Sequence, residues 1–61
     1  MTPSEQIKSI RARTGLSQAA FAAEYELPRR TVEDWEAGRR SPTPWALNLL
    51  DRITAIDYPL P

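Results

Sequence analysis

Apolar residues recur along the chain three or four positions apart, in stretches separated by residues that end helices. This spacing puts the apolar side chains on one face of a helix. It predicts helices over residues 3–14, 18–25, 29–37 and 44–56. We expect a core formed by Ile10, Phe21, Val32, Trp35, Leu47 and Leu50. Because no stretch alternates apolar and polar residues as a half-buried strand does, the sequence predicts an all-α, compact four-helix domain.

Capping residues support these helix boundaries. Thr2 and Glu5 have the spacing of a capping box, in which the cap and the third helical residue bond to each other's backbone. Ser17 is a good N-cap for the second helix. Two glycines, Gly15 and Gly38, suit the left-handed position that ends a helix. Because the first cap directly follows the initiator methionine, we expect residue 1 to be a natural start.

The order of helix lengths predicts the domain type. Two short helices, joined by about three residues and framed by a helix on each side, have the arrangement of a helix-turn-helix. On periodicity alone, a plain helical hairpin bundle is the alternative. We expect residues 1–56 to form the domain. Residues 57–61 are expected to be a short C-terminal tail, because their prolines cannot continue a helix.

Composition narrows the chemistry that the chain can perform. It has 61 residues, with no cysteine and no histidine. Disulfides, thiol nucleophiles, Cys/His zinc sites and histidine acid–base catalysis are therefore excluded. No nucleophile–base pair or Gly-rich phosphate loop is found, so we expect a protein that is not an enzyme and needs no cofactor or metal. The longest apolar run, residues 19–23, is far too short to span a membrane, and we expect a cytoplasmic protein.

A longer motif adds a family resemblance over about two-thirds of the chain. The sequence reads GLSQ at residues 15–18, FA at 21–22 and TVEDWEAGRR at 31–40, followed by Pro42. This string resembles the XRE-type helix-turn-helix family of lambdoid phage repressors and Cro proteins. The resemblance implies a lambda-repressor-like fold and sequence-specific binding of double-stranded DNA, usually as a homodimer that represses transcription. It also implies a possible protein partner such as a toxin, because many antitoxins contain this domain.

The start of the third helix carries the expected base contacts. The resemblance assigns base reading to Arg29, Arg30 and Asp34, with Glu33 nearby. Arginine makes bidentate bonds to guanine in the major groove, and cations at a helix N-terminus oppose the helix dipole, so stability does not explain the two arginines. Asp34 can accept from cytosine N4 or orient Arg30 through an i,i+4 pair, and Glu33 can pair with Arg29 in the same way.

Phosphate contacts are expected on both sides of that helix. The resemblance gives Gln18, at the start of the second helix, the role of clamping a backbone phosphate, with Ser17 beside it. The loop after the third helix offers Arg39, Arg40 and Thr43. A helix cap at Ser17 and a solvated loop at the two arginines are the purely structural alternatives.

Two further residue assignments concern structure rather than DNA. The resemblance pairs Arg11 of the first helix with Glu36 of the third, as a largely buried ion pair that docks the two helices. The family usually has glycine in a left-handed conformation at the turn between its second and third helices, where this chain has Glu26. If that backbone shape is kept, a strained residue is expected at Glu26.

The last helix has a second apolar stripe that the core does not require. Leu49, Ile53 and Ile56 form this stripe, which is a candidate dimer face. The alternative is that the tail, with Leu60, folds back over it. Trp45 can cover the core edge, contact a DNA sugar or meet a partner.

Two function classes follow from these patterns. The first is a DNA-binding transcriptional regulator, most simply a repressor, with the third helix in the major groove. Net charge is zero, but the acidic residues Glu24, Glu26, Asp51 and Asp57 can lie away from the DNA. The second is a protein-interaction module of the same fold with little DNA affinity. Replacing Arg29 and Arg30 by alanine distinguishes the two.

Overall fold

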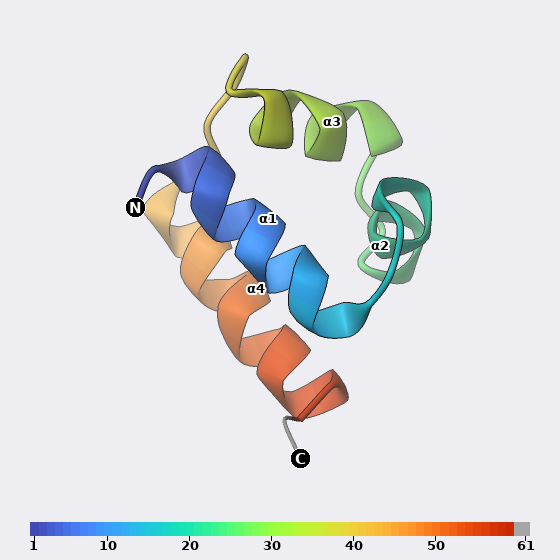
Figure 1. Ribbon diagram of the computed structural model, residues 1–61. Coiled ribbons are helices and arrows are strands. Elements are labelled where there is room, and N and C mark those ends of the chain that lie inside the picture. The colour runs from blue at the N-terminus through green and yellow to red at the C-terminus, as the bar shows by residue number, and fades with distance from the viewer. Residues whose placement is uncertain (60–61) are drawn as a thin grey trace.

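The computed structural model describes residues 1–59 and contains four helices. They are α1 (Pro3–Thr14), α2 (Gln18–Glu24), α3 (Arg29–Ala37) and α4 (Pro44–Asp57), as Figure 1 shows. The all-α, four-helix prediction is confirmed. The expectation for Leu60 lies outside the described residues.

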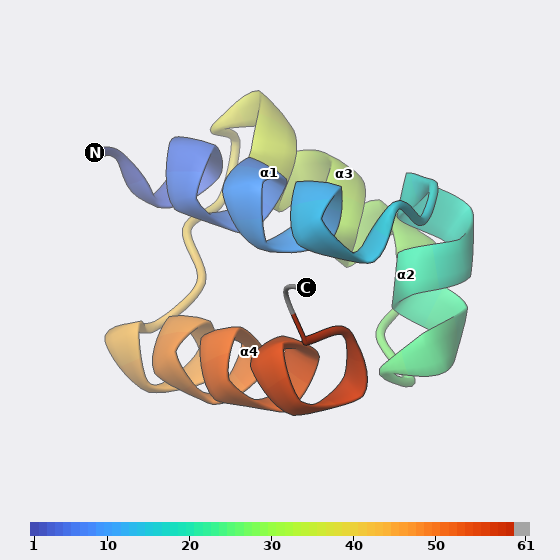
Figure 2. The same cartoon turned by 60° about the horizontal axis from the view of Figure 1, so that its bottom comes forward.

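The first helix is the centre of the arrangement. α1 packs against each of the other three helices, and α2 also packs against α3. α4 runs beside α1 in the same direction, while α3 lies on the other side of α1 (Figures 1 and 2). Figure 2 shows α2 standing across one end of these helices. This leaves one long side of α3 facing outward.

The core forms where all four helices meet. Ile7, Phe21 and Val32 are completely buried, and Ile10 and Leu50 are nearly so. Removing these apolar side chains from water is the main stabilising contribution in a domain of this kind. Two other expected core residues, Trp35 and Leu47, are half-buried and pack against the edge of this cluster.

The helix ends follow the expected caps. The capping box of Thr2 and Glu5 is present, and Gly15 and Gly38 end α1 and α3 with φ of 72° and 80°. α2 ends one residue earlier than expected, and α4 continues one residue further, through Asp57. The tail expected from residue 57 therefore starts inside the last helical turn.

The turn between α2 and α3 is tight because one residue is left-handed. Glu26 has a φ of 55°, the only positive φ among the non-glycine residues that the structure describes. This conformation lets the Leu27 amide donate to the Ala22 carbonyl at 2.8 Å, which closes the end of α2. Leu27 then packs on the core. The backbone shape expected at Glu26 is kept, without the glycine.

Tyrosine hydroxyls tie the C-terminal ends of α2 and α4 together. Tyr25 donates to Asp57 at 2.9 Å, and Tyr58 donates to Glu24. Burial, followed by the bond to Asp57, raises the pKa of Tyr25, and the bond to Glu24 raises the pKa of Tyr58. Both hydroxyls therefore keep their protons at neutral pH. Tyr58 turns toward α2, and Leu49 of α4 stays partly exposed.

Candidate nucleic-acid interface

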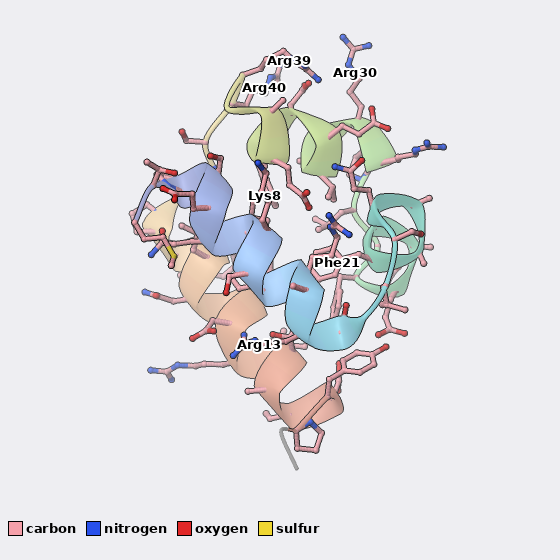
Figure 3. All side chains as sticks on the ribbon, viewed as in Figure 1. Lys8, Arg13, Phe21, Arg30, Arg39 and Arg40 are labelled. Carbon is pink, nitrogen blue, oxygen red and sulfur yellow. The ribbon has the colours of Figure 1, made fainter. Side chains whose placement is uncertain are left out.

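The outward side of α3 presents arginines at both of its ends. Figure 3 shows Arg30 near the start of the helix, with Arg39 and Arg40 just beyond its end, all directed away from α1 and α4. The opposite side of the helix buries Val32 and Glu36. The sequence produces this division because residues four apart share one helix face.

Each arginine in the first turn of α3 has a carboxylate one turn along. Arg29 Nε donates to Glu33 Oε2 at 2.8 Å. Arg30 is more loosely held, because its Nε lies 3.9 Å from Asp34 Oδ2 and its side chain is 84% exposed. The guanidinium of Arg30 thus remains open to a ligand.

Asp34 pairs more closely with Arg39 than with Arg30. Arg39 Nε donates to Asp34 Oδ1 at 2.8 Å, and this bond is the main cause of the lowered pKa of the Asp34 carboxyl. Spacing along the helix predicts only the contact with Arg30, four residues earlier, and not the contact with Arg39. The reason is the left-handed Gly38, which turns the chain back so that Arg39 lies over the last turn of α3.

A polar network docks α3 against the first two helices. Arg11 donates through Nε to Glu36 Oε2 at 2.6 Å and through Nη2 to Oε1 at 2.9 Å. Arg11 Nη1 also donates to the Leu16 carbonyl, and Gln18 Nε2 donates to Glu36 Oε1 at 3.2 Å. Burial raises the pKa of Glu36, but the bonds from Arg11 and Gln18 outweigh it and lower the pKa.

This network holds the side chain of Gln18 by one hydrogen bond. One N–H of its amide points inward to Glu36. The amide oxygen and the second N–H have no such partner among the hydrogen bonds of residues 1–59. Gln18 therefore joins the start of α2 to the pair that holds α3.

A family comparison identifies this arrangement. A model of the helix-turn-helix domain family matches residues 4–59, nearly the whole chain. The chain belongs to the helix-turn-helix domain family. Comparisons with curated proteins and with solved structures find no match. Within the helix-turn-helix domain, α2 and α3 are the two helices of the motif, consistent with the XRE-type resemblance, and the domain is of a class that binds DNA.

The two hydroxyl residues near the interface are helix caps of the helix-turn-helix domain. Ser17 Oγ accepts from the Ala20 amide, and Thr43 Oγ1 accepts from the Ala46 amide, each at 3.1 Å. A hydroxyl that accepts such a bond still has its own O–H to donate. Capping and phosphate binding are thus compatible at both residues.

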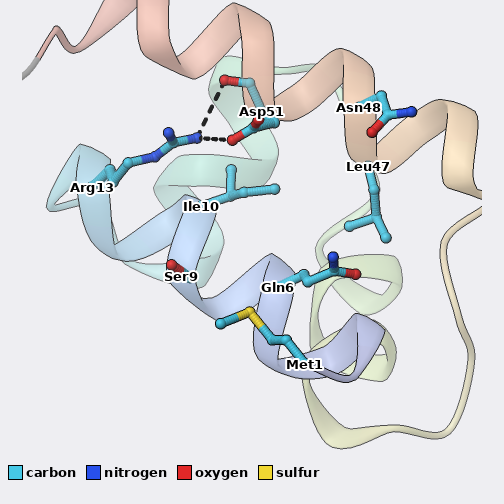
Figure 4. A pocket seen from close by; sticks show the side chains of 8 residues that line it. All are labelled: Met1, Gln6, Ser9, Ile10, Arg13, Leu47, Asn48 and Asp51. Carbon is cyan, nitrogen blue, oxygen red and sulfur yellow. Dashed lines mark hydrogen bonds and ion pairs between the residues drawn. The ribbon is translucent and has the colours of Figure 1, made fainter.

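The helix-turn-helix domain also has a groove between α1 and α4, which no pattern in the sequence predicts. Its volume is about 240 Å³, and Figure 4 shows Arg13 and Asp51 on its wall. Arg13 Nη2 donates to Asp51 Oδ1 at 2.6 Å and to the buried Thr54 hydroxyl at 2.9 Å. The volume is below the roughly 300 Å³ at which ligand pockets begin. All of these bonds come from Arg13 Nη2, and the buried Arg13 Nε has no hydrogen-bond partner among the described residues.

Among the described residues, no helix combines the length and the apolar character needed to cross a membrane.

Proposed function

We propose that the chain is a sequence-specific DNA-binding transcriptional regulator, acting as a repressor, which inserts α3 into the major groove. The observation that carries this proposal is the exposure of the Arg29 and Arg30 side chains in the first turn of α3, in a chain of the helix-turn-helix family. In such domains the N-terminal residues of the second motif helix contact base edges. Arginine there suits guanine O6 and N7.

Glu33 and Asp34 complete the proposed base-contacting set. Both carboxylates are already bonded to arginines, so their main contribution is to aim guanidinium groups. Acceptance of a cytosine N4 proton is a second role, better suited to Glu33, since Asp34 is 8% exposed.

Phosphate contacts flank α3 in this proposal. Arg39 and Arg40 are exposed beyond the C-terminal end of α3, on the side to which Arg30 points. Gln18 and Ser17 lie at the start of α2, where free backbone amides attract a phosphate. Thr43, at the start of α4, contributes its hydroxyl. These contacts set the register of α3 without reading sequence.

The distribution of charge supports DNA binding despite a net charge of zero. Asp51 is bonded to Arg13, and Asp57 and Glu24 are bonded to tyrosines at the far ends of α2 and α4. Asp51 and Asp57 belong to α4, which lies on the opposite side of α1 from α3 (Figures 1 and 2), whereas Glu26 lies in the turn directly before α3. Only a few arginines meet phosphate, so we expect weak binding to non-specific DNA.

The outer face of α4 is the proposed homodimer face. Leu49 and Ile56 are 40% and 77% exposed, and Trp45 of the same face is 73% exposed. Ile53 is half-buried at the edge of this face. A two-fold dimer through this face would match a palindromic operator. Residues 1–56 would supply the binding domain, with the last residues as a short tail.

A protein-interaction module is the second candidate function. The exposed apolar face of α4 favours it, because such a face binds a toxin or another regulator as readily as a second copy. In this case α3 would make no DNA contact, and its arginines would only form ion pairs with carboxylates of the same helix.

Single substitutions separate base contacts from phosphate contacts. The DNA affinity of each variant is measured on duplexes that the wild-type chain enriches from a random pool. Arg29→Ala or Arg30→Ala should lower affinity by about 1–3 kcal/mol and relax selectivity at one base position. Arg40→Ala should weaken binding to all sequences alike. It should also reduce by about one the slope of the logarithm of the binding constant against the logarithm of salt concentration. Arg52→Ala, on the outer side of α4 beside Trp45 and Leu49, is the charge-matched control on a duplex with a single half-site, where the proposed dimer face plays no part, and it should change neither. Unaltered DNA binding in both α3 variants would contradict the proposed major-groove contact.

A further inference from the structure

The Asp34 carboxylate lies between two arginines that come from opposite ends of α3. Its Oδ1 accepts from Arg39 Nε at 2.8 Å, and its Oδ2 lies 3.9 Å from Arg30 Nε. The two oxygens therefore face different arginines. One of these follows the helix and the other belongs to its first turn.

The backbone of Asp34 holds the same loop. Its carbonyl oxygen accepts from the Arg39 amide at 3.0 Å and from the Arg40 amide at 3.3 Å. Arg39 is thus fixed by both the side chain and the main chain of one residue. This double attachment restricts the rotamers of a side chain that is otherwise long and flexible.

Exposure differs sharply within this cluster. The side chain of Asp34 is 11% exposed, whereas those of Arg39 and Arg30 are 61% and 84% exposed. Asp34 uses only the Nε–H of Arg39. The four N–H groups on the two Nη atoms remain available, in a plane whose orientation Asp34 sets.

We propose that Asp34 is a positioning residue for DNA binding, which fixes the Arg39 guanidinium against a phosphate in register with Arg30 at the base edges. This inference rests on the proposed function. An arginine held in its binding geometry before the encounter loses less conformational freedom when DNA binds. Asp34 thereby links the phosphate-contacting end of the surface to the base-contacting end.

Simple electrostatics predicts the opposite effect of Asp34. A carboxylate close to DNA repels phosphates, so its removal should tighten binding to any sequence. Positioning predicts weaker binding to the preferred sequence, and only while Arg39 is present. The sign of the effect and its dependence on Arg39 therefore distinguish the two explanations.

A double-mutant cycle tests the proposal. It compares the wild-type chain, Asp34→Asn, Arg39→Ala and the double variant on an enriched duplex and on a scrambled duplex. Asp34→Asn should weaken binding of the enriched duplex about fivefold in the wild-type background. In the Arg39→Ala background it should have no effect or tighten binding. Asp51→Asn, which removes the α4 carboxylate that pairs with Arg13 of α1, is the charge-matched control and should behave as the wild-type chain.

A second measurement needs no variant to fold. In the DNA-free wild-type chain, the Arg39 Nε–H should give a separate NMR resonance protected from solvent exchange, and this resonance should keep its position when DNA binds. Rapid exchange in the free chain would overturn the inference, as would additive effects in the cycle or tighter binding by Asp34→Asn. A wild-type chain that binds no duplex would overturn the proposed function and, with it, the role of Asp34 on DNA.

Discussion

Glu26 adopts a backbone conformation that residues with a Cβ disfavour. Its φ of 55° lies in the left-handed region, which costs a non-glycine residue about 1–2 kcal/mol. The Glu26 side chain is exposed and makes none of the hydrogen bonds among residues 1–59 that could offset this cost. The conformation is imposed by its neighbours, since Leu27 must reach both the Ala22 carbonyl and the core.

Glu26→Gly should therefore stabilise the domain. Part of the relieved strain is offset by the greater freedom of glycine in the unfolded chain, which leaves a gain of about 1 kcal/mol. For a domain of this size that gain raises Tm by about 4–8 °C. Glu26→Ala, which removes the charge but keeps a Cβ, should leave Tm nearly unchanged. An equal rise in both variants would mean that charge, rather than strain, is responsible.

Glu36 is the second residue whose substitution has a predictable effect on stability, because it is buried and paired with Arg11. Glu36→Gln leaves Arg11 partly buried without a counter-charge, and loss of one partner of such a pair costs about 3 kcal/mol or more. This is comparable to the roughly 3–5 kcal/mol that the core of a domain this small supplies. Glu33→Gln, the same change in an exposed pair on the same helix, should cost less than about 1 kcal/mol. Urea unfolding measures both, and similar losses would contradict a structural role for the Arg11–Glu36 pair.

At the level of elements, the helix boundaries could be predicted from the sequence because each cap involves residues only a few positions apart. Thr2 and Ser17 accept from the amides that the cap spacing predicts, and α3 has the expected bounds. The hydrogen bond from Arg39 to Asp34 could not be predicted in this way. It depends on the direction that the chain takes after Gly38, and spacing along a helix carries no information about a residue beyond its end.

Gly38 connects the end of α3 to the arginines that follow it. Gly38→Ala should lower stability by about 1 kcal/mol, because φ is 80°. A Cβ there meets nothing within 4 Å, so strain is the only cost. Relief of that strain would shift Arg39 and Arg40 and weaken DNA binding.

Gly15→Ala is the matched control for this prediction. Gly15 has φ of 72° and equally open surroundings, but it ends α1, away from the arginines. Its loss of stability should be similar, with DNA affinity retained. Equal losses of DNA affinity in the two variants, measured at a temperature where both are folded, would show that the loop after α3 has no special part.

The whole molecule separates its polar contacts by position. Arginines lie along α3, and tyrosine–carboxylate bonds lie at the far ends of α2 and α4. The family motif predicted the first group. The second group could not be predicted, because it joins residues more than thirty positions apart through the packing of whole helices. The position of Trp45 could not be predicted either, because it also depends on how whole helices pack. The structure leaves its side chain exposed on the outer face of α4.

Acid should unfold the molecule through carboxylates with lowered pKa. Hydrogen bonds from Thr2 lower the pKa of Glu5, and Arg39 lowers that of Asp34; bonds from Arg11 and Gln18 outweigh burial to lower that of Glu36. Their ordinary values are 4.5 for Glu and 3.8 for Asp. The folded chain thus binds protons more weakly than the unfolded chain.

The stability that these carboxylates provide is fully present above about pH 4.5 and is lost as the pH falls through the lower folded-state values. With no histidine, the chain should show little change in stability between pH 5.5 and pH 8. Urea unfolding of the wild-type chain from pH 2 to pH 8 measures this profile. A steep change near pH 6.5 would contradict the assignment.

Selection of duplexes from a random DNA pool, near physiological salt, tests DNA reading by α3 most directly. The wild-type chain and the Arg29→Ala, Arg30→Ala double variant are run in parallel, with folding of both checked by circular dichroism. We predict that the wild-type chain enriches a palindromic motif with half-sites about one helical turn apart, and that the variant loses it. A single enriched half-site would retain DNA reading without the dimer. No enrichment by the folded wild-type chain, or the same motif from the variant, would contradict DNA reading by α3.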